Sequence, residues 1–137
     1  MELLVSGQTG NIINETRRID ALLVGKLPMD DFRRSLKLRN ELFIFKHAAE
    51  ASEFELAIKN DPPDIIMAFP DENPHGESFE RKLMTLCRLQ MNSRTIVLCD
   101  KPFRYLHIAL KTKVAALLSL KTDRSDLEII IREVCGG

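Results

Sequence analysis

The sequence predicts an α/β protein built on a parallel β-sheet with helices on both faces. Short apolar runs, each about as long as one strand, recur along the chain. Between them lie segments whose apolar residues are spaced by three and four, as on one side of a helix. The runs are apolar throughout rather than alternately apolar and polar, which is typical of strands buried on both faces of a parallel sheet.

Five such runs lie beyond residue 19, and we expect each to form a strand. They are Ala21–Val24, Leu42–Phe45, Ile65–Phe69, Thr95–Cys99 and Val114–Leu118. Five strands that alternate with helices imply right-handed crossovers and a parallel sheet. The strand order 2-1-3-4-5 of a flavodoxin-like, doubly wound (βα)5 fold is the simplest arrangement for a sheet of this size.

A helical segment follows each predicted strand. Three of these segments carry apolar positions at helical spacing, which are Met29, Phe32 and Leu36, then Phe79, Leu83 and Leu86, then Phe103, Leu106 and Leu110. The second and the last helices each begin with a serine followed three residues later by a glutamate, at Ser52 and at Ser125. This spacing predicts a capping box, in which both side chains bond to free amides of the first turn.

The length of 137 residues fits one domain with a substantial core. Residues 1–18 do not fit the repeat, so we expect an N-terminal arm or leader followed by one domain over residues 19–137. Lys and Arg together number 20, as do Asp and Glu, so the formal net charge is zero. A neutral segment is not expected to bind nucleic acid or an anionic membrane by itself.

Neither a membrane-spanning run nor a signal-peptide pattern is visible, which predicts a cytoplasmic protein. The three cysteines are an odd number without a CxxC pair, so we expect unpaired thiols in a reducing compartment. The three histidines have no metal-ligand spacing to one another or to the cysteines, and no metal site is predicted.

The central predicted strand, Ile65–Phe69, leads into a polar loop with two acids, Asp71 and Glu72. The carboxyl end of such a strand is where open α/β sheets place their chemistry. A site is therefore expected at this edge of the sheet, although an Asp-Glu-Asn sequence is also typical of an ordinary solvated turn.

With these elements placed, residues 19–137 resemble the receiver domain of bacterial response regulators, and most of all the NarL/FixJ/LuxR type. Three stretches carry the resemblance: residues 21–28, residues 61–76 and residues 118–137. They resemble, in turn, the first strand with its acid pair and proline, the third strand with its phosphoacceptor loop, and the fifth strand with its Lys-Asp turn and last helix.

The resemblance implies a phosphorylation site that has been lost. In typical receivers an Asp after the third strand accepts the phosphoryl group, and an acid pair after the first strand holds Mg²⁺. Here Gly25 and Lys26 stand at the acid pair, and the acceptor position falls on Ala68 or Phe69. A cation at a Mg²⁺-ligand position repels the metal, so this domain is expected to work without phosphate, metal or other cofactor.

Of the two remaining functional positions, Cys99 replaces the Thr or Ser that binds a phosphoryl oxygen, and Lys121 alone matches the pattern. One hypothesis is that Lys26, Lys121 and Asp71 form an internal ion cluster that replaces Mg²⁺ and phosphate. The alternative is that they are three unrelated surface charges. A third possibility is that Asp71 has become a displaced phosphoacceptor.

The leading functional hypothesis is a non-enzymatic, phosphorylation-independent receiver that regulates through protein-protein contacts and forms a homodimer. The resemblance implies a dimer surface on the last two helices, with Tyr105, His107, Lys111 and Arg132 as candidates. It also implies a LuxR-type transcription regulator whose DNA-binding domain lies beyond residue 137. A stand-alone adaptor and a small-molecule sensor with a pocket over Phe69 and Cys99 are the alternatives.

Overall fold

A computed structural model describes residues 19–25, 43–48, 51–70 and 78–136 of the chain. Its five described strands form one parallel sheet in the order β3-β2-β4-β5-β6. They are β2 (Ile19–Val24), β3 (Phe43–Ala48), β4 (Ile65–Ala68), β5 (Thr95–Cys99) and β6 (Ala116–Ser119). The predicted arm at residues 1–18 and the predicted helix with Met29, Phe32 and Leu36 lie outside the described residues.

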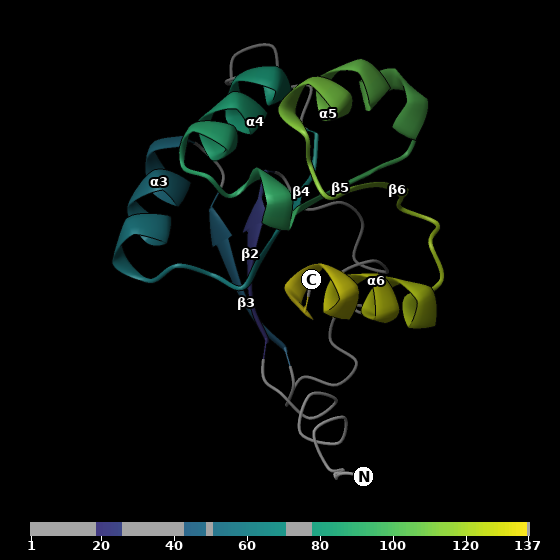
Figure 1. Ribbon diagram of the computed structural model, residues 1–137, viewed down its shortest axis with the longest axis horizontal. Coiled ribbons are helices and arrows are strands. Elements are labelled where there is room, and N and C mark those ends of the chain that lie inside the picture. The colour runs from purple at the N-terminus through teal and green to yellow at the C-terminus, as the bar shows by residue number, and fades with distance from the viewer. Residues whose placement is uncertain (1–18, 26–42, 49–50, 71–77, 137) are drawn as a thin grey trace, which may run out of the picture.

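The helices are α3 (Ala51–Asn60), α4 (Phe79–Arg88), α5 (Leu106–Thr112) and α6 (Arg124–Gly136), with short 3-10 turns η1 (Asn92–Arg94) and η2 (Pro102–Tyr105). Helices α3, α4 and α5 cover one face of the sheet, and α6 lies on the other (Figure 1). The α/β class with helices on both faces, predicted from the apolar runs, is therefore confirmed.

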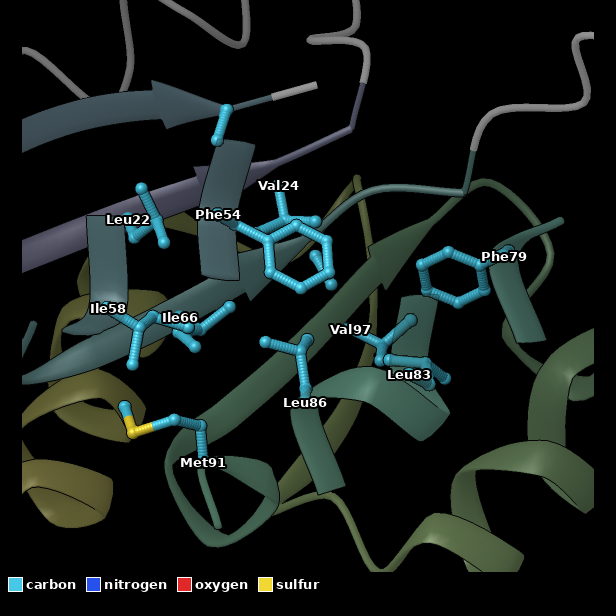
Figure 2. Packing of buried hydrophobic residues seen from close by; sticks show 12 residues of the cluster. Leu22, Val24, Phe54, Ile58, Ile66, Phe79, Leu83, Leu86, Met91 and Val97 are labelled. Carbon is cyan, nitrogen blue, oxygen red and sulfur yellow. The ribbon is translucent and has the colours of Figure 1, made fainter. Parts of the chain in front are cut away.

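Side chains that alternate along the central strands divide the core into two clusters. Leu22, Ile66 and Val97 point to the α3 and α4 side, where they meet Phe54 and Leu83 (Figure 2). Leu23, Met67 and Leu98 point the other way, where they meet Leu127 and Ile131 of α6. Because both faces of the sheet are covered, most positions of the central strands are apolar.

Two predicted helix starts are wrong. Helix α3 includes Ser52 as its second residue, and Glu55 bonds to Arg88 and Lys59 rather than to the start of the helix. Helix α6 begins at Arg124, so Ser125 is again inside the helix. Its hydroxyl donates to the Asp123 carboxylate at 2.6 Å. The Leu127 amide also bonds back to the Asp123 carbonyl, so Asp123 and not Ser125 is the residue that immediately precedes the helix.

The last strand begins two residues later and ends one residue later than expected, at 116–119 instead of 114–118. Lys113 adopts a left-handed conformation with φ of 57° at the end of α5, and the Val114 amide donates to the Ala109 carbonyl at 3.2 Å. The Val114 amide therefore caps the end of α5 instead of pairing in the sheet. Ala115 then bonds to the Thr95 carbonyl, and the strand begins after it.

The expected apolar side of the helix with Phe103, Leu106 and Leu110 is also wrong. These residues are 78%, 49% and 68% exposed. The segment forms η2 and α5, and its buried positions are Ala109 and Thr112. Tyr105 and Ile108 also pack against the core on this side, which leaves Phe103, Leu106 and Leu110 on the outside.

Candidate functional site

The predicted site lies where β2 and β4 end side by side, and its centre is closed by the backbone. The Phe69 amide donates to the Val24 carbonyl at 2.9 Å, and the Gly25 amide donates to the Ala48 carbonyl at 3.1 Å. These two bonds continue the sheet pairing one residue past the strands. They set Gly25 directly beside Phe69.

Gly25 occupies a space that only glycine can fill. Its φ is 104°, in the region that side chains disfavour. A Cβ built at this position would collide with the carbonyl oxygen of Phe69, which is a backbone atom. No acid can stand here in this conformation, so the described part of the site has no metal-holding carboxylate at the first position of the expected pair.

The two candidate acceptor positions point to opposite faces of the sheet, and both are core. Ala68 is fully buried in the cluster with α3 and α4. Phe69 is 2% exposed and packs in the cluster with α6. The side chain that follows the central strand therefore contributes hydrophobic burial instead of a nucleophile.

Cys99, at the end of β5, is the third member of the site. It is 5% exposed, and its carbonyl accepts from the Leu120 amide at 3.0 Å. Burial raises the pKa of the Cys99 thiol, and the nearby Asp100 carboxylate raises it further. The protonated thiol is the form favoured here, which is a poor nucleophile and a poor metal ligand.

Lys121 lies beyond β6 with an exposed side chain. The Lys121 amide donates to the Ser119 hydroxyl at 3.0 Å. The Thr122 hydroxyl donates to the Ser119 carbonyl at 2.7 Å. These bonds fix the turn after the last strand. Lys26, Asp71 and Glu72 lie outside the described residues, so the proposed ion cluster and the displaced acceptor stay hypotheses.

The candidate dimer residues fall into two environments. Tyr105 is half-buried and packs edge-on against Phe79, with 5.5 Å between the ring centres and 80° between the ring planes. His107 is exposed on α5, and the Lys111 ammonium lies 3.7 Å from a Glu80 carboxylate oxygen on α4. Arg132 is half-buried on α6, with its guanidinium 3.6 Å from the Glu128 carboxylate.

The exposed apolar residues that sequence reasoning missed lie on η2 and α5. Phe103, Leu106 and Leu110 form an exposed stripe along η2 and α5, which the helical spacing alone had assigned to the core. One signal could have revealed it, since residues 101–113 carry four Lys or Arg and no Asp or Glu. The described residues contain no cluster of three or more His, Cys, Asp or Glu side chains that could hold a metal.

The three cysteines are free thiols, with Cys87 and Cys135 half-buried. Within the described ranges, no helix has the length and apolar character needed to cross a membrane.

No protein-family model matches the sequence, and no curated protein is significantly similar to it. Solved structures are similar in fold. A LuxR-family two-component response regulator from an Aurantimonas species superposes with a TM-score of 0.69 and 17% identity, over 88% of this chain and 86% of its own. A CheY-like receiver domain protein from Methanospirillum hungatei gives 0.68 and 17%, over 87% and 94%.

The signal receiver domain of the putative response regulator NarL from Mycobacterium tuberculosis gives a TM-score of 0.64 with 16% identity, over 88% of this chain and 98% of its own. Identities this low do not carry over activity or partners, but they agree on the architecture. The chain has the fold of a response-regulator receiver domain.

Proposed function

We propose that this chain is a receiver-like regulatory domain that acts through protein-protein contacts and does not use phosphorylation or catalyse a reaction. The observation that carries the proposal is the contact between Gly25 and Phe69. It puts a glycine with no room for a Cβ where the metal-holding acid would be, and a buried phenylalanine at the acceptor position. Phosphoryl transfer depends on positioning and on charge compensation, and among the described site residues only the exposed Lys121 carries a charge that could compensate.

The sheet order supports the same proposal. Counted from β2, the order β3-β2-β4-β5-β6 corresponds to the order 2-1-3-4-5 of a flavodoxin-like receiver. We further propose that the domain belongs to a LuxR-type transcription regulator in the cytoplasm, with a DNA-binding domain beyond residue 137, and that it forms a homodimer. Accessible polar residues on α5, such as His107 and Lys111, support a contact surface there.

The test compares the melting temperature and the solution mass of the purified chain with and without Mg²⁺ and beryllofluoride, which mimics a phosphoryl group on a carboxylate. The expected result is no change in either quantity, with a dimer already present. A Mg²⁺-dependent rise in melting temperature would overturn the proposal, because it requires an acceptor carboxylate such as Asp71.

A small-molecule sensor is the second candidate, and one feature favours it. A cavity of about 150 Å³ lies near the start of β2, lined among others by Asp20, Ala57, Asp61 and Pro63. Sequence reasoning had placed a pocket over Phe69 and Cys99, which lie at the opposite end of the sheet. A small molecule that raises the melting temperature of the wild type, but not of an Ala57→Leu variant that fills the cavity, would support this candidate.

A further inference from the structure

A cavity lies between the end of α3 and the start of β2, and we call it the α3 cavity. Its volume is about 150 Å³, and Leu22, Ala57 and Pro63 are among its lining residues. Leu22 and Pro63 are buried, and Leu22 points to the α3 side of the sheet (Figure 2). A cavity of this volume with an apolar lining is large enough to hold a benzene ring.

The polar lining residues lie at the mouth of the α3 cavity. Asn60 and Asp61 are exposed and Asp20 is half-buried, in contrast to the buried Leu22. Asp20 lies two residues before Leu22 on β2, so both side chains are on the α3 side of the sheet. A ligand whose apolar part enters the cavity therefore meets two carboxylates and one amide at the mouth.

The end of α3 adds negative charge at the same place. The helix ends at Asn60, and the carbonyl groups of a last helical turn form the negative end of the helix dipole. The basic residue of this turn, Lys59, has its ammonium 3.5 Å from the Glu55 carboxylate. None of the residues that line the cavity is basic. The mouth therefore favours a cation over an anion.

The Asp20 carboxylate is positioned to bind that cation. The Asp20 amide donates to an Asp64 carboxylate oxygen at 2.9 Å, and the Asp20 carbonyl accepts from the Asp64 amide at 2.8 Å. These bonds fix the backbone of Asp20. Within the described ranges, its carboxylate makes no hydrogen bond or ion pair of its own. A half-buried carboxylate gains more from an ammonium ion than a fully solvated one does.

We infer that the α3 cavity binds a primary ammonium ion with a compact apolar body, which lies against Leu22, Ala57 and Pro63 while the ammonium donates to the Asp20 carboxylate. This inference rests on the second candidate function above and adds the chemistry of the ligand. A free amino acid fits less well, because its own carboxylate would lie beside those of Asp20 and Asp61.

The probe is benzylamine, which has one ring and one ammonium group, and its binding to the full chain is followed by isothermal titration calorimetry. Benzyl alcohol and benzoate are the matched ligands, because they keep the ring and replace the ammonium with a neutral hydroxyl or a carboxylate. We expect benzylamine to bind about tenfold more tightly than benzyl alcohol, since a charge-assisted hydrogen bond is stronger than a neutral one. Benzoate should not bind.

Two variants separate the charge from the cavity. Asp20→Asn should weaken the binding of benzylamine by about tenfold and leave that of benzyl alcohol unchanged. Ala57→Leu fills the cavity and should abolish the binding of both ligands. Asp20 contributes only backbone atoms to its bonds with Asp64, so Asp20→Asn should fold, and its melting temperature without ligand checks this. Glu133→Gln, an exposed acid on α6, is the control and should bind as the wild type does.

Three results would overturn the inference. Benzylamine shows no saturable binding, or benzyl alcohol or benzoate binds as tightly as benzylamine, or Asp20→Asn binds benzylamine as the wild type does. Binding of benzyl alcohol without a preference for benzylamine would overturn the ammonium ligand and leave a small-molecule sensor standing. None of these results depends on Mg²⁺ or beryllofluoride, so failure here is distinct from failure of the proposed function.

Discussion

Phe69 and Phe103 lie in two regions where the structure differs from what the sequence suggests. Phe69 follows the central strand, where a receiver needs a polar nucleophile, and it is 2% exposed in the core. Phe103 begins a segment with the apolar spacing of a buried helix, and it is 78% exposed. One region is closed where chemistry is expected, and the other is open where core is expected.

Position in the fold and pattern in the sequence are thus separate kinds of information. The edge of the sheet near Gly25 is closed by backbone contact and apolar burial. The outside of α5 carries an apolar stripe, whereas Ala109 and Thr112 are buried on its inner side.

The largest effect is expected from Phe69→Asp, which restores the acceptor residue type. It removes a buried ring and buries a carboxylate in its place, so the free energy of unfolding should fall by more than about 4 kcal/mol. Urea denaturation measures it. The control is the same change at the exposed position, Phe103→Asp, which should cost less than about 1 kcal/mol. Similar losses at the two positions would break the comparison.

The next effect is expected at Gly25. Gly25→Ala should lower the free energy of unfolding by about 3 kcal/mol, because a Cβ collides with the Phe69 carbonyl and φ is positive. Gly25→Asp should be at least as damaging and should not create Mg²⁺ binding. Gly136→Ala is the matched control, since a Cβ there meets nothing within 4 Å. A stable Gly25→Asp variant that binds Mg²⁺ would contradict the interpretation that the contact between Gly25 and Phe69 closes this site.

Cys99 offers a kinetic test of the same closure. Iodoacetamide should label Cys87 and Cys135, which are half-buried, well before Cys99, and mass spectrometry of digested protein reads the order. Burial raises the pKa of the Cys99 thiol, so the folded state favours the protonated form. The contribution of the Cys99 thiol to the free energy of unfolding is therefore full below the ordinary thiol pKa, and it is lost as pH rises through the raised pKa. Labelling of Cys99 first at neutral pH would show an open, activated thiol.

The smallest effect is expected at the surface link between α3 and α4. The Glu55 carboxylate lies 2.9 Å from the Arg88 guanidinium and 3.5 Å from the Lys59 ammonium. The hydrogen bond from Arg88 is the main reason that the pKa of Glu55 is lowered. The stability that this hydrogen bond adds is present above the unfolded pKa of a glutamate, and it is lost as pH falls through the lowered pKa of Glu55.

Glu55→Gln should therefore lower the melting temperature slightly at neutral pH and leave it unchanged in strong acid, because exposed ion pairs contribute little. The control is Glu133→Gln, which alters an exposed carboxylate on α6. A pH profile of melting temperature that is the same for Glu55→Gln and the wild type would mean that the link adds nothing.

The α/β class and the approximate positions of the described strands follow from the sequence alone. A short apolar run with polar boundaries is typical of a strand buried on both faces of a parallel sheet, and this pattern is local to each run. Composition likewise indicated free thiols, which the structure confirms. The helix starts at Ser52 and Ser125 failed because each helix already includes the residue before its serine, and spacing alone cannot locate the first turn.

Which apolar residues are core, and what closes the expected site, depends on contacts between elements that are distant in the sequence. The exposure of Phe103 depends on how closely α5 approaches the sheet, and that distance is set by residues on several elements. The conformation of Gly25 depends on its contact with Phe69, which lies 44 residues later in the chain. Burial and backbone contact are properties of neighbours in space, and a linear pattern records only neighbours in sequence.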